Sequence, residues 1–288
     1  MPSDPAVLRV LESRTLNHLP WLIHGFSTRR GGFSRRYGGR SLNLGFTRDD
    51  SSTTVERNRR AFLEAIGALR GRRLWPLVTL RQIHSDLIHH IDSPPRHQLT
   101  GDGLITSAPE MLLAVQAADC LPVILVDVEH YAVGAFHAGW RGTVKRILAK
   151  AVGEMHRQFR SEPRRIKAAI GPGIHACCYE VGPEVREKFE SQFNYASDLF
   201  RETKVSYPVR QRSMSFLQAR PPGHSGKPSH FFLDLVEANR RQLVDAGVRS
   251  TNITASRLCT ACNPDLLFSY RAENAVTGRM LGVVGIKT

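Results

Sequence analysis

The sequence predicts an α+β fold, a single domain with a mixed β-sheet core flanked by helices. Short runs rich in Val, Ile and Leu and bounded by polar residues are typical of buried strands, and the stretch 112–143 contains three of them. Other segments have apolar residues three and four positions apart, which predicts amphipathic helices. Strands and helices alternate irregularly, so we expect one domain over residues 1–288 rather than a regular βαβ array.

The elements follow from these patterns in chain order. The predicted strands are 77–83, 112–115, 123–128, 132–136, 166–170, 253–257, 267–271 and 281–286. The predicted helices are 51–67, which Ser52 or Thr53 can cap, 143–159, 183–193 and 233–246. Two Gly-rich basic stretches, 27–34 and 37–45, are predicted to be turns that can also bind an anion. Residues 220–230, rich in Pro and Gly, are predicted to be a loop.

The composition is that of a soluble globular protein, with 41% hydrophobic and 23% charged residues. We expect a cytoplasmic location and no membrane association, because no apolar run is long enough to cross a bilayer and no secretory signal is visible. Five cysteines are an odd number, which favours free thiols over a disulfide framework. The net charge of +14 comes from scattered arginines without a long basic run, so specific nucleic-acid binding is not expected.

Three residues that border predicted strands stand out as a candidate site: His84, Cys120 and His137. Two His and one Cys form a ligand set that suits Zn²⁺, and three protein ligands leave a fourth tetrahedral position open for water or substrate. The same residues also suit a thiolate nucleophile with a histidine base, which Asp119 or Asp102 can orient. The default interpretation is that these are an ordinary buried cysteine and two hydrogen-bonded histidines. Spacing alone does not distinguish between this interpretation, the zinc site and the thiolate nucleophile.

The other four cysteines give a weaker signal. Cys259 and Cys262 form a CxxC pair, but Cys177 and Cys178 are adjacent and do not form a second pair of similar spacing. The CxxC pair is compatible with a structural zinc site or a redox pair, but a zinc ribbon needs two such pairs, so these residues are predicted to be plain buried or loop thiols.

Several segments occur here in an order that resembles a known family. They include HGFSTRRGGFS (24–34), QIHSD (82–86), QAADCLPVILVD (116–127), AFHAGWRGT (135–143) and CTACNPDLLFSYRAEN (259–274). The chain is similar over about residues 22–286 to the YfiH/laccase-domain family, also known as DUF152 and once described as multicopper polyphenol oxidases. The resemblance implies a YfiH-like fold and a zinc-dependent purine nucleoside phosphorylase. Such enzymes cleave adenosine, inosine, guanosine and methylthioadenosine with phosphate, and they also deaminate adenosine.

The resemblance also implies roles for individual residues. The family's zinc ligands correspond to His84, Cys120 and His137, and the implied partners are purine nucleosides and phosphate, bound by a chain that we expect to be monomeric. Phosphorolysis needs an anion site, for which the candidates are Arg141, Arg29 and Arg30. Asn43 is a candidate for binding ribose or base. Asp102 is the first candidate carboxylate for proton transfer, and Glu180 is the second.

Two other classes of protein stay open as alternatives. A copper-dependent polyphenol oxidase, as the older family description suggests, would need several copper centres, yet the sequence has no His-x-His pair. One His₂Cys set can hold a single copper ion, so copper remains the alternative metal. A hydrolase with a Cys/His nucleophile pair is the second alternative.

Overall fold

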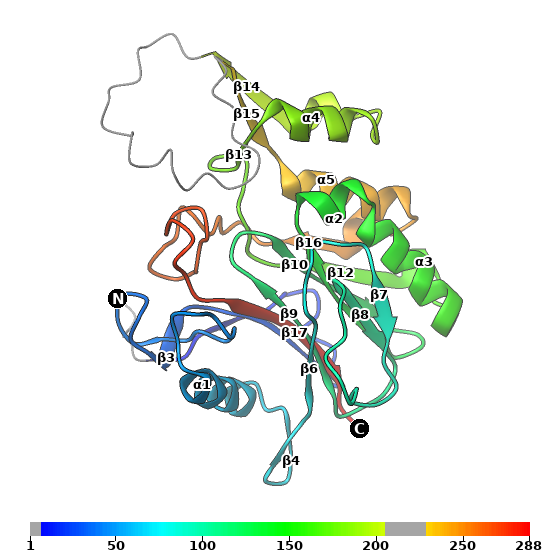
Figure 1. Ribbon diagram of the computed structural model, residues 1–288. Helices are drawn as coiled ribbons and strands as arrows, with labels where there is room; N and C mark the ends of the chain where they lie inside the picture. Colours follow the sequence, from blue (N-terminus) through cyan, green and yellow to red (C-terminus); the bar gives the residue numbers. More distant parts are fainter. Residues whose placement is uncertain (1–6, 205–228) are drawn as a thin grey trace.

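The computed structural model describes residues 7–204 and 229–288, and two mixed sheets packed against each other form its centre (Figure 1). The first sheet has five strands in the order β1 (Val10–Leu11), β2 (Leu22–Ser27), β17 (Met280–Ile286), β9 (Leu112–Ala117) and β6 (Leu77–Thr79). The second has six in the order β16 (Ile253–Ala255), β12 (Ile166–Ile170), β10 (Leu121–Asp127), β11 (Ala132–Ala138), β8 (Gly103–Thr106) and β7 (Ile88–His90). This confirms the predicted α+β class with a mixed-sheet core.

Smaller elements complete the described chain. A three-stranded sheet has the order β13 (Glu180–Val181), β15 (Ser229–Leu233) and β14 (Phe200–Lys204), and β4 (Leu69–Arg70) pairs with β5 (Arg73–Leu74). The helices are α1 (Ser52–Ala65), α2 (Trp140–Val144), α3 (Ile147–Phe159), α4 (Pro183–Glu190) and α5 (Leu235–Asp245). Short 3₁₀ turns occupy Pro163–Arg165, Ala196–Leu199 and Ser250–Asn252. The predicted loop 220–230 lies outside the described residues except for its last two, which belong to β15.

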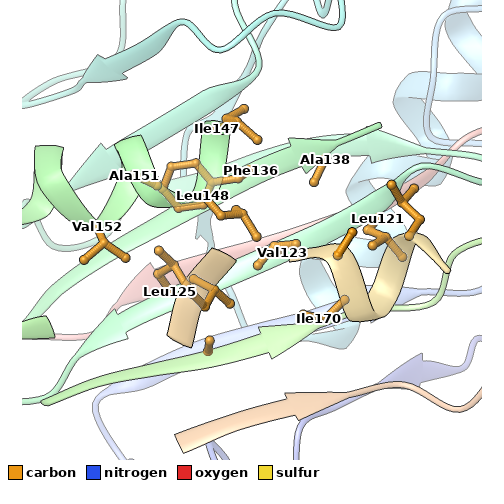
Figure 2. Packing of buried hydrophobic residues seen from close by; sticks show 14 of the residues in the cluster. Leu121, Val123, Leu125, Phe136, Ala138, Ile147, Leu148, Ala151, Val152 and Ile170 are labelled. Carbon is orange, nitrogen blue, oxygen red and sulfur yellow. The ribbon is translucent and has the colours of Figure 1, made fainter. Parts of the chain in front are cut away.

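Strand β10 shows why the central strands are apolar throughout. Successive side chains of a strand point to opposite faces, and both faces of β10 are covered. Leu121, Val123 and Leu125 face a core shared with α3, which Figure 2 shows from close by. Ile124 and Val126 face the core between the two sheets.

The outer faces of both sheets are covered by helices. Helices α2, α3 and α5 lie over the six-stranded sheet, while α1 lies against the five-stranded sheet on the opposite side (Figure 1). Helix α1 contributes Phe62 and Leu63 to the core of that outer face. Its N-cap is Ser51, whose side chain accepts a hydrogen bond from the Thr54 amide, so the cap lies one or two residues earlier than predicted. The result is a four-layer arrangement of helix, sheet, sheet and helix (Figure 1).

Four predicted segments differ in the structure, three of them because a side chain holds the backbone in another conformation. The predicted strand 77–83 ends at Thr79. The predicted helix 143–159 is divided into α2 and α3 at Arg146, which has a left-handed φ of +62°. Helix α2 is held to α5, because the Gln242 amide donates to the Thr143 carbonyl at 2.8 Å, and the chain must turn before α3 can begin.

The two other differences concern loops. Within the stretch 27–34, predicted to be a turn, Arg30–Ser34 forms strand β3, and a Cβ on Gly31 would lie 2.2 Å from the Leu8 backbone nitrogen. These glycines therefore serve close backbone packing. The predicted strand 267–271 is irregular, with a bend at 267 and a turn at 270–271, because the Glu273 carboxylate accepts the Ser269 amide at 3.0 Å and bends the chain back on itself.

In the part of the chain that the structure describes, no helix has both the length and the apolar character needed to span a membrane.

Candidate metal centre and active site

His84, Cys120 and His137 converge in the folded chain, His84 after strand β6, Cys120 immediately before β10 and His137 within β11. Each offers one ligand atom, and these atoms all lie within 4.8 Å of one another. The imidazole rings of His84 and His137 meet edge to face, with centroids 5.0 Å apart. His137 is buried, Cys120 is half-buried and His84 is exposed, so the cluster is open to solvent on the His84 side.

The hairpin β10–β11 positions two of the three residues, Cys120 and His137. Its antiparallel register pairs Leu121 with Ala138, and one further step along the ladder brings Cys120 opposite Gly139. A Cβ on Gly139 would lie 2.8 Å from the Cys120 Sγ and 3.1 Å from the His84 Cδ2. Glycine is therefore required at position 139 by the space that the ligands occupy.

Asp102 holds the third ligand in place. Its fully buried carboxylate accepts hydrogen bonds from the backbone amides of Ile83, His84 and Ser85 at 3.2, 3.1 and 2.6 Å. The Ser85 hydroxyl donates to it as well, at 2.7 Å. His84 has a φ of +57°, a conformation that costs a non-glycine residue free energy. The three amide bonds offset that cost and explain why strand β6 does not continue to residue 83.

Asp102 also fixes the orientation of His137. Its Oδ1 lies 2.8 Å from the His137 Nδ1, and its carbonyl oxygen accepts the His137 amide at 2.8 Å. With Nδ1–H donating to the carboxylate, Nε2 is left as the ligand atom, which is the usual carboxylate–histidine arrangement behind a metal ligand. The contacts of Asp102 are those of a positioning residue.

The electrostatics of the cluster favour a thiolate. Burial disfavours ionisation of Cys120, but His137 and His84 outweigh it and lower the pKa of the thiol to about 6. Burial likewise disfavours charge on His137, yet the Cys120 thiolate and Asp102 raise the pKa of the imidazole to about 9. For Asp102, hydrogen bonds from His137 and Ser85 outweigh burial and lower the pKa of the carboxyl. The site therefore stabilises positive charge beside a sulfur ligand.

This donor set fits a metal ion on chemical grounds. Two imidazoles and one thiolate suit Zn²⁺, and the same ligands are found in sites for a single copper ion. Gly139 leaves the room that the ligand atoms need, and the oriented His137 fixes one coordination direction. The exposed edge at His84 leaves access for a fourth ligand.

Two arginines influence the pKa of Tyr179, which the Cys120 thiolate also influences, and only Arg141 was named from the sequence. Arg141 is exposed on α2, with its guanidinium 4.4 Å from the centre of the Trp140 ring. Arg271 lies 5.6 Å from the centre of the Tyr179 ring. Burial raises the pKa of Tyr179, the Cys120 thiolate raises it further, and the two guanidinium groups oppose this rise. Both cations are thus within electrostatic range of a residue beside the thiol.

The other residues predicted to bind substrate have partners within the protein. Arg29 donates to the carbonyls of Pro264 and Tyr37 at 2.6 and 2.5 Å and pairs with Glu273 at 3.0 Å. Arg30 donates through Nε to the Asp265 carbonyl at 2.9 Å. These contacts link the N-terminal strands to the C-terminal turns and favour a structural role.

Asn43 and Glu180 are also engaged. The fully buried Asn43 donates to the Asp50 carboxylate at 2.9 Å, while its oxygen accepts the amides of Gly45 and Arg279. The Glu180 carboxylate pairs with His230. Their contacts therefore favour structural roles over ribose binding and proton transfer.

Two features of the site differ from the sequence predictions. Asp119 was named as a residue that could orient a histidine, but its carboxylate binds Thr260, Ser269 and Arg271, and His137 binds Asp102. Asp119, with a φ of +101°, accepts hydrogen bonds from the Thr260 and Ser269 hydroxyls at 2.6 and 2.7 Å and from the Arg271 amide at 2.7 Å. It therefore anchors the turn that carries Cys120 to the C-terminal turns. The second feature is a cluster of four cysteine side chains whose Sγ atoms all lie within 4.8 Å: Cys177, Cys178, Cys259 and Cys262. The prediction of unrelated thiols did not anticipate this convergence.

Comparisons with known proteins identify the family of this chain. Residues 23–287 match the family described as multi-copper polyphenol oxidoreductase laccase. The chain is 34% identical over 272 residues to purine nucleoside phosphorylase YlmD of Geobacillus stearothermophilus, covering 91% of this chain and 89% of the relative. It is 34% identical over 267 residues to a protein named adenosine deaminase from an unknown prokaryotic organism, covering 89% and 91%.

A solved structure shows the same fold. The crystal structure of the hypothetical protein YfiH of Bacillus licheniformis superposes with a TM-score of 0.80 and 31% identity, covering 99% of this chain and 98% of that one. The matched segment 23–287 contains all three ligands of the cluster as well as Asp102 and Arg141. The chain belongs to the YfiH family of laccase-domain proteins, whose relatives are named as purine nucleoside enzymes.

Proposed function

We propose that this protein is a zinc-dependent purine nucleoside phosphorylase. It would convert adenosine, inosine, guanosine or methylthioadenosine and phosphate to the free base and the sugar 1-phosphate, and would also deaminate adenosine. The observation that carries the proposal is the convergence of His84, Cys120 and His137 within 4.8 Å, open on one side. Relatives at 34% identity are named for both activities.

Phosphorolysis involves three changes that the site must assist. A phosphate oxygen forms a bond to C1′ of the sugar, the glycosidic C–N bond breaks, and its electron pair passes to the base, which takes up a proton. Bound zinc would supply a Lewis acid at its open position. Arg141 and Arg271 are suited to holding the phosphate dianion close to that position, because guanidinium groups bind its oxygens through charge-assisted hydrogen bonds.

Asp102 contributes through His137 in this proposal. Its two oxygens already accept four hydrogen bonds from residues 83–85 and a fifth from His137, and its lowered pKa keeps it ionised. It therefore holds a proton on the His137 Nδ1 and keeps Nε2 directed at the metal. Asp102 is therefore proposed to position His137, in place of the proton transfer to substrate that was predicted from the sequence.

The laccase description of the family favours a second candidate function, copper-dependent oxidation of phenols. The described residues offer two groups that can hold a metal, the His₂Cys cluster and an all-cysteine cluster. Reduction of O₂ to water in a laccase depends on several copper centres rich in histidine, and a single His₂Cys set provides one. The small number of histidine-containing metal sites therefore favours the phosphorylase over the copper oxidase.

Base release from inosine tests the proposal, measured with and without phosphate on the purified protein, on Cys120→Ala and on His97→Ala as a control at an exposed histidine. We expect hypoxanthine and ribose 1-phosphate only with phosphate, loss of both in Cys120→Ala, and native activity in His97→Ala. Zinc-loaded, folded protein that releases no base from inosine, adenosine or methylthioadenosine would refute the proposal. Activity that persists after removal of all metal would instead support a Cys/His nucleophile.

A further inference from the structure

We propose that Cys177, Cys178, Cys259 and Cys262 form a second metal site that binds one Zn²⁺ through four thiolates and fixes the turn of Cys120. This site is separate from the His84–Cys120–His137 cluster, since none of its ligands is shared. Soft thiolate ligands in a set of four select zinc among the common divalent ions.

The geometry of the four sulfur atoms suits one tetrahedral ion. All four Sγ atoms lie within 4.8 Å of one another, with Cys177–Cys262 at 3.5 Å and Cys178–Cys262 at 3.3 Å. A zinc ion with Zn–S bonds of about 2.3 Å in a tetrahedron separates its sulfur ligands by roughly 3.8 Å. Small side-chain movements therefore convert the observed cluster into a coordination shell.

A disulfide explains the cluster less well. Cys262 lies at nearly the same distance from two adjacent cysteines, so neither pair is preferred. One disulfide would also leave two thiols of the cluster unused. A single ion engages all four residues at once, and Cys177 and Cys262 are exposed, so an ion has access from solvent.

The backbone around the cluster supports thiolate ligands. The His175 amide donates to the buried Cys259 Sγ at 3.5 Å, the type of hydrogen bond that stabilises a coordinated thiolate. The two ligand loops also pair directly, through a bridge between Gly173 and Cys259 and a bond from the Thr260 amide to the Gly173 carbonyl at 2.9 Å. The ion would join loops that are more than 80 residues apart in sequence, as the separation of 84 between Cys178 and Cys262 shows.

The same two loops hold the turn that precedes strand β10. The Ile174 amide donates to the Asp119 carbonyl at 2.7 Å, and the Thr260 hydroxyl donates to the Asp119 carboxylate at 2.6 Å. Asp119 is the left-handed residue immediately before Cys120. Because all four positions are filled by protein, the second ion is structural, and its effect on the active site passes through Asp119.

Metal content per chain tests the proposal without relying on activity. We expect two zinc ions in the native chain, one in His84→Ala/Cys120→Ser, and one in Cys178→Ser/Cys262→Ser. Retention of one zinc by the variant that lacks the first site supports the second site, even if the proposed enzyme function fails. No zinc in that variant, or a mass lower by two hydrogen atoms that reveals a disulfide among the four cysteines, would overturn the proposal.

Cobalt substitution identifies the ligands. In His84→Ala/Cys120→Ser, Co²⁺ added to the metal-free protein is expected to give strong thiolate-to-cobalt charge-transfer absorption and tetrahedral visible bands. Adding Cys178→Ser and Cys262→Ser should abolish both. A weak octahedral spectrum in the parent variant contradicts four-thiolate ligation. The parent variant keeps all four cysteines, so it decides the matter even if the serine variants fail to fold.

Discussion

At the scale of single residues, Asp102 links the two histidine ligands. It binds the strained backbone at His84 and the Nδ1 of His137 with one buried carboxylate. Removing its negative charge thus affects two ligands at once, although neither is changed.

We therefore predict that Asp102→Asn weakens zinc binding at the first site by about 10- to 100-fold, the usual effect of losing such a supporting partner. The amide nitrogen would also face backbone N–H donors in a buried position. Chelator competition measures the affinity, with Asp92→Asn as the control at an exposed carboxylate. Equal zinc affinity in the native chain and Asp102→Asn would show that Asp102 does not support the metal site.

Arg141 is the second residue whose role can be measured directly. If its guanidinium holds phosphate, Arg141→Gln should raise the phosphate KM by roughly 10- to 100-fold, the equivalent of one hydrogen bond to a charged group. The exposed Arg249 provides a control, Arg249→Gln, which should leave the KM unchanged. An unchanged phosphate KM in Arg141→Gln would show that Arg141 does not bind phosphate. Arg271 would then be the remaining candidate for that role.

The sequence indicated the three residues of the cluster because each borders a predicted strand, and the resemblance to a family supported the choice. It did not indicate that the polar groups of Asn43 and Arg29 are used within the protein, because those contacts join residues far apart in the chain. The cluster of four cysteines was missed for the same reason. The adjacent Cys177 and Cys178 resemble a ligand pair only after the loops pair in three dimensions.

At the scale of elements, the junction between β11 and α2 sets the size of the site. Gly139 has extended backbone angles that alanine adopts without strain, with φ at −80° and ψ at 171°. The obstacle to a side chain there is the ligand cluster itself.

Gly139→Ala is therefore expected to reduce zinc binding and phosphorolysis strongly while leaving the melting temperature of the metal-free protein nearly unchanged. The matched control is Gly153→Ala in α3, where an added Cβ meets nothing within 4 Å. That control should keep full activity and gain about 0.5–1 kcal/mol of stability from helix propensity. Full zinc occupancy in Gly139→Ala would show that position 139 has room for a side chain beside the bound ion, against the prediction.

Element existence was largely predictable, whereas element ends were not. The apolar runs of β10, β11 and β12 and the amphipathic patterns of α1 and α5 identified those elements. The ends depend on hydrogen bonds between side chains and the backbone, such as those of Asp102 after β6 and of Gln242 between α2 and α3. These bonds join residues far apart in the chain and therefore leave no local pattern in the sequence.

At the scale of the whole molecule, stability should depend on pH through a buried histidine remote from the metal ligands in sequence. The Nε2 of His24 accepts the Ser13 amide at 3.0 Å, which requires a neutral ring nitrogen. Burial lowers the pKa of His24 below its ordinary value of 6.5, in spite of the nearby Glu12. The unfolded chain therefore binds a proton more readily than the folded chain.

The free energy of unfolding should fall as the pH drops below about 6.5, by at most about 1.4 kcal/mol per pH unit from this group. His24→Gln should reduce that slope, since the amide oxygen does not titrate in this range. Urea unfolding at several pH values measures it, with the exposed His18→Gln as control. Identical slopes in the native chain and His24→Gln would contradict the prediction.

The central claim is that one metal ion at His84, Cys120 and His137 makes this fold a phosphorylase. The most direct measurement is the rate of phosphate-dependent hypoxanthine release from inosine as zinc is returned to metal-free protein. The account predicts negligible activity without metal and a rise to a plateau as the first site fills, with no rise in Cys120→Ala. Full activity in protein shown to contain no metal, or an equal rise in Cys120→Ala, would contradict it.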